Sequence, residues 1–242
     1  MKVSIRLVLF LLLSGFFFGM ALVSCKKKET ALVKTLPTDS IKDVDGNYIS
    51  IIKIGEQWWT AEDLAVKKYR DNTPINVLDV PSKWQNGNDG YRQGLNNTSG
   101  YFYNLKAILH PSGLAPAGWH VATEEDWKKL ETHIGCPLSE LEKNGWRAHG
   151  LAAKLKISSP EGWTRYGDVW SENESGFGAT ASGVILPNGN SAEGGVNRMG
   201  FWWALETTDS TCYYRYMDYK NNSIFREKTN ARYGMCVRCV KD

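Results

Sequence analysis

Short apolar or aromatic runs dominate the chain from residue 43 to residue 242, and Gly, Asn, Asp and Pro break them at short intervals. Runs of this length between turn residues are typical of β-strands, whereas patterns long enough for helices are few. Glycine and the large aromatic residues are abundant, with 23 Gly, 11 Tyr and 10 Trp in the chain. About 200 residues suit one domain with a sizeable core. The pattern therefore predicts a single domain of many short strands and long loops.

One stretch, residues 118–130, predicts a helix that the rest of the domain packs against. Thr123 is a favourable N-cap, and Asp126 stands three residues later, where a capping-box partner is expected. Acidic residues fill the first turn, where the helix dipole favours negative charge. Gly135 is placed to end the helix. The apolar residues that fall on one face of this helix are Trp127, Leu130 and Ile134.

Turn residues divide the rest of the domain into predicted hairpins and loops. Residues 45–47 (Asp-Gly-Asn) and 55–56 (Gly-Glu) predict two turns between opening strands. Residues 70–100 are rich in Asn, Asp and Gly and predict a long surface loop. A second helical stretch is expected near residues 138–156. The C-terminal part predicts an antiparallel meander whose parts are a strand at 212–217, a turn at 221–222, a strand at 224–226 and a closing strand at 234–240. We expect the closing strand to lie centrally, beside the opening one.

The N-terminus has the pattern of an export leader. In residues 1–24, Lys2 and Arg6 precede an almost unbroken apolar run from 7 to 23, as in a secretory signal. The run ends in Leu-Val-Ser before Cys25, which resembles the lipobox of bacterial lipoproteins. That resemblance implies cleavage before Cys25 and acylation of its sulfur and new amino group. The alternative is an uncleaved transmembrane anchor.

Residues 25–42 are expected to be the lipidated cysteine followed by a polar linker. The membrane is then a partner through the anchor at Cys25, and the predicted location is the cell envelope, as an outer-membrane lipoprotein. The three lysines after Cys25 indicate either a solvated tether with head-group contacts or export to the outer surface. The whole chain has a formal net charge of only +3, which argues against a nucleic-acid binder.

Six sequence blocks in order resemble a known family. They are DGN with an isoleucine-rich strand and IG-Q-WW-AEDL; GYFYN; Pro-x-Gly-Trp-His with Glu-Asp-Trp; Gly-Phe-x-Ala; Gly-Phe-Trp-Trp; and a terminal Val-Arg-Cys-Val-Lys-Asp. Together they are similar to the Fibrobacter succinogenes major paralogous domain, over residues 43–242. The family consists of secreted or lipid-anchored bacterial proteins, common in Bacteroidetes and Fibrobacteres, and implies no established activity.

The resemblance implies a C-type-lectin-like fold, similar to the branch that contains the formylglycine-generating enzymes. That fold is α+β, with a twisted antiparallel sheet, two helices and long loops. The chain departs from the family at Ala115, where members often carry a cysteine that partners the terminal one. Cys239 therefore lacks its usual partner, and Cys136 is the substitute that we expect.

Cys136, Cys212, Cys236 and Cys239 remain beside the lipidated Cys25. An even number of cysteines in an exported protein favours disulfides, and three pairings are possible. We prefer Cys212 with Cys236, on neighbouring strands, and Cys136 with Cys239. The alternatives are free thiols, or a redox pair or half metal site in the C-x-x-C of residues 236–239. In a strand, however, these two residues face opposite sides.

Other candidate residues carry weaker predictions. Asp43, Asp45 and Asn47 resemble the start of a calcium loop, but the glutamate that the motif needs is missing. For His120, a packed structural histidine is favoured over a catalytic base. The tryptophans expected in the core are Trp58, Trp59, Trp119 and Trp127. Trp202 and Trp203 would point to opposite faces of a strand, so one is expected to be exposed as a platform for sugars.

These observations favour a non-enzymatic, lipid-anchored envelope or surface module that binds a glycan or an envelope protein through its long loops. No catalytic motif, resident metal or cofactor is predicted. One alternative is an enzyme of the formylglycine-generating type, with Cys236 and Cys239 as a thiol or copper site. The other is a structural subunit of a surface assembly such as a pilus.

Overall fold

The computed structural model describes residues 39–94, 100–157, 162–169, 171–206 and 212–242, which belong to one compact unit, Leu36–Asp242. The strands are β1 (Ser40–Lys42), β2 (Tyr48–Ile54), β3 (Gln57–Thr60), β4 (Tyr91–Gln93), β5 (Tyr101–Asn104), β6 (Trp119–Val121), β7 (Gly145–Arg147), β8 (Met199–Ala204), β9 (Cys212–Asp218), β10 (Ile224–Thr229), β11 (Gly234–Met235) and β12 (Cys239–Lys241). The helices are α1 (Pro81–Gln85), α2 (Leu105–Ile108), α3 (Glu124–His133), the 3-10 helix η1 (Leu138–Glu140) and α4 (Leu151–Leu155). The fold is therefore α+β, but the described residues form four short α-helices rather than the two expected.

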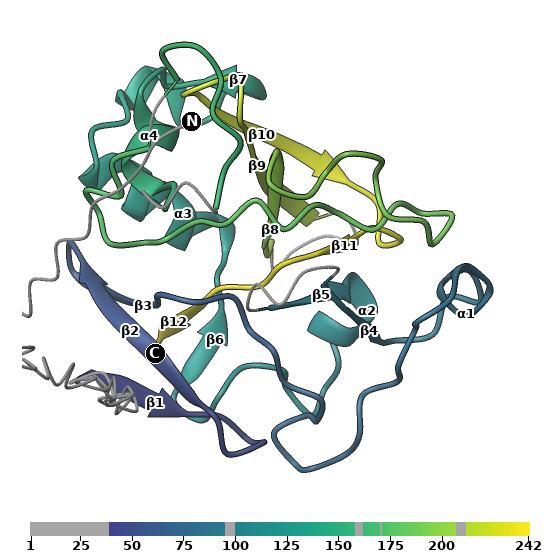
Figure 1. The fold of residues 1–242 in the computed structure, drawn as a ribbon. Helices are drawn as coiled ribbons and strands as arrows, with labels where there is room; N and C mark the ends of the chain where they lie inside the picture. The colour runs from purple at the N-terminus through teal and green to yellow at the C-terminus, as the bar shows by residue number, and fades with distance from the viewer. Residues whose placement is uncertain (1–38, 95–99, 158–161, 170, 207–211) are drawn as a thin grey trace, which may run out of the picture. The chain divides into compact units, whose positions relative to one another are not determined.

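A five-stranded antiparallel sheet has the order β1-β2-β3-β12-β6 (Figure 1). Its two opening hairpins turn at Gly46 and Gly55, whose φ angles of +88° and +61° suit glycine. The closing strand β12 lies between β3 and β6, and Val240 pairs with Trp59. The prediction of a central closing strand beside the opening hairpin is thus confirmed. The strand β1 falls in the last residues of the range 25–42, so these residues belong to the sheet.

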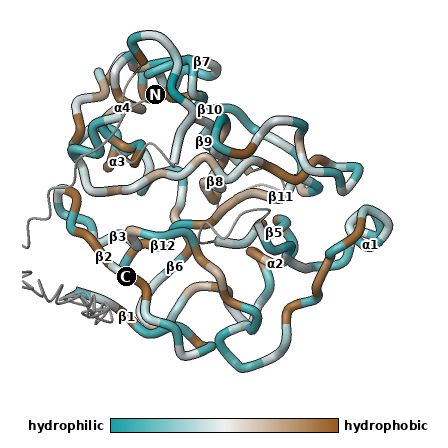
Figure 2. The backbone as a smooth tube through the Cα atoms, viewed as in Figure 1, coloured by the Kyte–Doolittle hydropathy of each residue, from teal (hydrophilic) through white to brown (hydrophobic). Residues whose placement is uncertain are grey.

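A second antiparallel sheet has the order β7-β10-β9-β8, and its β9–β10 hairpin confirms two strands of the predicted C-terminal meander. The single closing strand predicted over residues 234–240 is wrong, because this stretch forms β11 and β12, which belong to two other sheets. The helical stretch expected over residues 138–156 is wrong for its middle part, which is the strand β7. Gly145 and Gly150 have φ angles of +78° and +89°, which interrupt a helix, and β10 supplies a pairing partner for β7. The third sheet, β11-β5-β4, takes β4 from within the loop predicted over residues 70–100, which also carries α1. Hydrophilic and hydrophobic stretches alternate along this segment (Figure 2).

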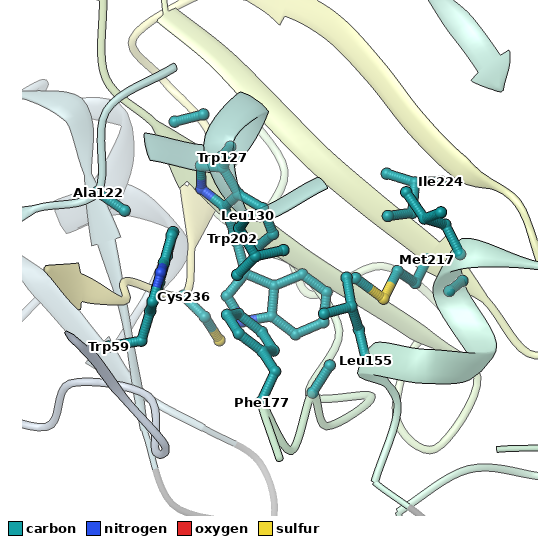
Figure 3. Close-up of a cluster of buried hydrophobic side chains, with 14 of the residues drawn as sticks. Trp59, Ala122, Trp127, Leu130, Leu155, Phe177, Trp202, Met217, Ile224 and Cys236 are labelled. Carbon is teal, nitrogen blue, oxygen red and sulfur yellow. The ribbon is translucent and has the colours of Figure 1, made fainter. Parts of the chain in front are cut away.

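Two clusters of buried side chains stabilise the domain. The first core gathers Trp59, Trp127, Phe177 and Trp202, whose rings point toward one another in Figure 3. Trp59 and Trp127 lie 5.5 Å apart in an edge-to-face arrangement, which aromatic pairs prefer. The second core contains Tyr103, Trp119, Val121, Trp203 and Cys239.

The helix α3 forms as predicted. Thr123 accepts a hydrogen bond from the backbone N–H of Asp126, and the Asp126 side chain accepts one from the backbone N–H of Thr123, which completes a capping box. Trp127 and Leu130 are fully buried in the first core and Ile134 is nearly so. No helix in the described part of the chain has the length and apolar character to span a bilayer.

Candidate functional site

Four of the six family-like sequence blocks meet in a buried hydrogen-bond network around Asp63 and Arg238. Arg238 of the terminal block donates to Asp63 of the AEDL block, with 2.5 Å between Nε and Oδ1. Trp202 donates its indole N–H to the same oxygen at 2.8 Å. The Arg238 guanidinium also donates to the backbone carbonyls of Thr60 and Phe177. These side chains are almost fully buried, so this hydrogen-bond network stabilises the fold.

A second buried network joins α3 to the four-stranded sheet. Arg215 of β9 donates to Glu124 and Glu131 of α3 at 2.7 and 2.6 Å. Arg226 of β10 donates to Glu124, and Arg147 of β7 donates to Glu131, each at 2.7 Å. The sequence interpretation treated Glu124 only as a dipole partner, and it missed Glu131. Both glutamates are buried because the sheet presents arginines to that side of α3.

Neither predicted disulfide is formed in the structure, where Cys136, Cys212, Cys236 and Cys239 are all free, buried thiols. Cys136 and Cys236 belong to the first core, whereas Cys212 and Cys239 belong to the second. Each predicted pair, Cys212–Cys236 and Cys136–Cys239, would join thiols from different cores. Ala115 shares the second core with Cys239, so Cys136 does not occupy the place of the cysteine that family members carry. The lipidation candidate Cys25 lies outside the described residues.

The C-x-x-C at residues 236–239 does not form a two-thiol site. Cys236 points into the first core, as Figure 3 shows, and Cys239 lies in the second. Burial raises the pKa of Cys239 to about 12 and raises the pKa of Cys236 well above its usual range, so both thiols are protonated at neutral pH. This arrangement weighs against the thiol or copper enzyme. In the described part of the chain, no group of three or more His, Cys, Asp or Glu side chains is placed to hold a metal ion.

His120 is the hydrogen-bonded structural histidine that the sequence favoured. Its Nε2 lies 2.9 Å from Asp126 Oδ2 and its Nδ1 lies 2.8 Å from Asp242 Oδ1. Burial disfavours the imidazolium, but the hydrogen bonds to the two carboxylates outweigh that effect and raise the pKa of His120. At the first hairpin, Asp43 accepts hydrogen bonds from the backbone and side-chain N–H groups of Asn47. The protein itself thus engages this carboxylate.

A concavity of about 900 Å³ lies between the β2–β3 turn and the exposed side of α3. A neighbouring hollow of about 270 Å³ shares Lys53 and His133 with it. The lining of the 900 Å³ groove mixes lysines with glutamates. Lys128 lies 3.0 Å from Glu125 and 2.7 Å from Glu142. Charges of both signs therefore line this groove, and they point to no particular ligand.

A different surface, the outer face of the four-stranded sheet, carries four aromatic residues in direct register. Trp146 of β7 pairs with Phe225 of β10, which pairs with Tyr216 of β9, which pairs with Phe201 of β8. We call these four residues the aromatic row. Because neighbouring strands are about 4.8 Å apart, the row is about 14 Å long. Tyr214 lies beside it, with its ring centroid 6.1 Å from that of Phe201.

The rings of the aromatic row contact one another and remain partly accessible. The ring centroids of Trp146 and Phe225 are 5.3 Å apart, and those of Tyr216 and Phe201 are 4.4 Å apart in a stacked pair. Trp146 is 43 % exposed, and the other three rings are partly buried. Phe201 packs against the second core, which anchors that end of the row. Aromatic rings held in fixed positions at a surface lose little entropy when a ligand stacks on them.

Two carboxylates lie on the same face as the aromatic row. Tyr216 donates its hydroxyl hydrogen to Asp218 Oδ2 at 2.5 Å, and Glu227 lies directly opposite Tyr214 in the strand pairing. Burial, and then the nearby Glu227 charge, raise the pKa of Tyr214 to about 12, so its hydroxyl stays neutral. The site thus combines aromatic faces with carboxylates and neutral phenol groups.

Sequence reasoning missed the aromatic row and assigned the exposed platform to one residue of the Trp202–Trp203 pair. That prediction is wrong, because both tryptophans are fully buried. The alternating Tyr214 and Tyr216 within the predicted strand were a usable sign of an aromatic face. Trp146 lay in a stretch that was interpreted as helical, so its place in the row could not be foreseen.

Comparison with known proteins gives one family and no individual relative. The model of the Fibrobacter succinogenes major domain matches residues 52–241, which runs from β2 to β12. Searches of curated proteins and of solved structures found no match.

Proposed function

The chain belongs to the Fibrobacter succinogenes major domain family, and from that premise we propose that it is a non-enzymatic, lipid-anchored module of the cell envelope that binds glycans. The observation that supports glycan binding is the aromatic row on the outer face of β7, β10, β9 and β8. The binding surface is therefore a sheet face, and not the long loops that the sequence suggested.

Carbohydrate is the ligand class that suits this surface best. Pyranose rings present apolar C–H faces between polar edges, and they stack on the faces of aromatic side chains. The row offers four such rings over about 14 Å, together with hydroxyl and carboxylate groups for sugar hydroxyls. Stacking over that length suits several consecutive sugars of one chain. A row of rings along a sheet face also suits a polymer better than a small molecule, which is usually enclosed in a pocket.

The anchoring and the fold type belong to the same proposal. The leader of residues 1–24 and the lipobox at Cys25 support an acylated N-terminus in the envelope. Lipidation would hold the glycan-binding face close to the cell and leave the domain free to move on its linker. The mixture of antiparallel sheets, a capped helix and long loops supports a C-type-lectin-like arrangement. Mass spectrometry of the N-terminal peptide from the native membrane fraction tests the anchor.

The binding function is tested with the full chain purified in detergent. Affinity is measured for soluble hexasaccharides of glucose, mannose, xylose and N-acetylglucosamine. We expect at least one of them to bind, and Trp146→Ala or Tyr216→Ala to weaken that binding by about three- to tenfold, since an aromatic contact contributes about 0.5–1.5 kcal/mol. Tyr48→Ala is the matched control, because Tyr48 is 52 % exposed on β2, in a different sheet.

Two results would contradict the proposal. The absence of binding across the hexasaccharides and their insoluble polymers would remove the glycan function. Binding that Trp146→Ala and Tyr216→Ala leave intact, or that Tyr48→Ala weakens equally, would show that the aromatic row is not the binding surface. Circular dichroism of each variant separates lost binding from lost folding.

A further inference from the structure

The four-stranded sheet separates its charged side chains by sign. Arg147, Arg215, Arg226 and Lys228 all lie on the inner face, where the three arginines contact the glutamates of α3 and Lys228 lies over the ring of Tyr213. On the outer face, the charged side chains of these strands are Asp218 and Glu227. The alternation of side chains along β9 and β10 produces this separation.

The two carboxylates border the aromatic row on neighbouring strands. Asp218 stands two residues after Tyr216, and Glu227 stands two residues after Phe225, so each is the next residue along its strand on the outer face. A ligand that stacks on Tyr216 and Phe225 therefore lies within reach of both carboxylates. The face presents negative charge to the ligand, while the balancing cations are held behind the sheet.

We propose that Asp218 and Glu227 make this surface selective for glycans that carry free amino groups, and that they disfavour acidic glycans. This inference rests on the proposed glycan-binding function and adds the charge of the ligand to it. A protonated sugar amine gains an ion pair or a charge-assisted hydrogen bond with either carboxylate. A uronic acid or a sulfate instead meets like charge beside the stacking rings, and none of the residues of β7, β8, β9 and β10 places a cation on this face.

The test compares three hexamers with the full chain in detergent at pH 5.5 and low salt. They are hexaglucosamine, which is cationic at this pH, neutral hexa-N-acetylglucosamine, and anionic hexagalacturonate. We expect hexaglucosamine to bind about three- to tenfold more tightly than its acetylated form, and the anionic hexamer to bind weakest. Added salt should reduce the difference, because exposed charges are screened.

The double variant Asp218→Asn with Glu227→Gln keeps the shape of the face and removes its charge. We expect it to bring the affinities for the amine and acetylated hexamers within about twofold of each other. Glu56→Gln, in the β2–β3 turn, is the control with a single charge removed from an exposed site elsewhere, and it should leave the selectivity unchanged.

The outcomes separate this inference from the function it rests on. Equal affinity of the unaltered protein for the amine and acetylated hexamers, or tighter binding of the anionic one, would overturn the selectivity and leave glycan binding intact. Binding of none of the three hexamers, nor of the neutral hexasaccharides above, would overturn both. Selectivity that survives the double variant would show that Asp218 and Glu227 are not its source.

Discussion

Trp202 and Trp203 are consecutive residues of β8, and their indole N–H groups donate to partners on opposite sides of the strand. Trp202 donates to Asp63 Oδ1 and Trp203 to the backbone carbonyl of Tyr103, each at 2.8 Å. Both side chains are fully buried, one in each core. The strand β8 therefore joins the two cores, and each indole satisfies a buried acceptor.

Replacing either indole should destabilise the protein strongly. Trp202→Phe removes a donor from the buried carboxylate of Asp63, and Trp203→Phe removes one from a buried carbonyl. Each change also leaves a small void, so we expect a loss of about 2–4 kcal/mol in the free energy of unfolding. Trp146→Phe is the control at a 43 % exposed site and should cost less than about 1 kcal/mol. Urea unfolding measures all three, and similar values for the three variants would contradict the two-core arrangement.

The buried charge network predicts a large difference between two glutamates of α3. Glu131→Ala leaves Arg147 without its buried carboxylate and removes one of the two that hold Arg215, and breaking such a pair typically costs about 3–5 kcal/mol. Glu125→Ala, on the same helix, removes a carboxylate that is 71 % exposed and should cost less than about 1 kcal/mol. Thermal and urea unfolding provide the measurement. A small effect of Glu131→Ala would mean that water or another group satisfies these arginines.

His120 makes part of the stability dependent on pH. Its pKa is raised in the folded protein, because its hydrogen bonds to Asp242 and Asp126 outweigh the opposing effect of burial. The folded state thus binds the His120 proton more tightly than the unfolded state does, and this tighter binding stabilises the fold. The stabilisation is fully present below the ordinary pKa of about 6.5, and it is lost as pH rises through the higher pKa that His120 has in the folded protein. Because glutamine cannot take up this proton, His120→Gln should destabilise the protein more at pH 5.5 than at pH 8.5. Equal destabilisation at the two pH values would contradict a charged His120 that is stabilised by Asp126 and Asp242.

The four described cysteines should behave as protected thiols. Burial raises the pKa of Cys212 to about 12 and also raises the pKa of Cys136, and Cys236 and Cys239 are equally enclosed. We expect no alkylation of these four cysteines in the native protein, and alkylation of all four after unfolding without a reductant. Intact mass before and after treatment provides the measurement. If the unfolded protein gains further alkyl groups only after it is reduced, the cysteines form disulfides, and the prediction of free thiols is wrong.

Local sequence was sufficient for several elements of this fold. The capping box of Thr123 and Asp126, the two glycine turns of the opening hairpins and the β9–β10 hairpin were all predicted and are present. Each depends on residues within a few positions of one another, where hydrogen bonding and backbone conformation act locally. The central place of β12 was also predicted, from the tendency of the two ends of a domain to lie close together.

Tertiary structure decided the features that depend on distant segments. Trp202 and Trp203 are both buried because β8 has a core on each side, which alternation along one strand cannot reveal. The aromatic row unites residues 146, 201, 216 and 225 through the register of three strand pairs. The same register places the four cations on the inner face of the sheet and the two carboxylates on its outer face. Side-chain periodicity tells which residues of a strand share a face, but only strand pairing tells which strands share that face and what covers it.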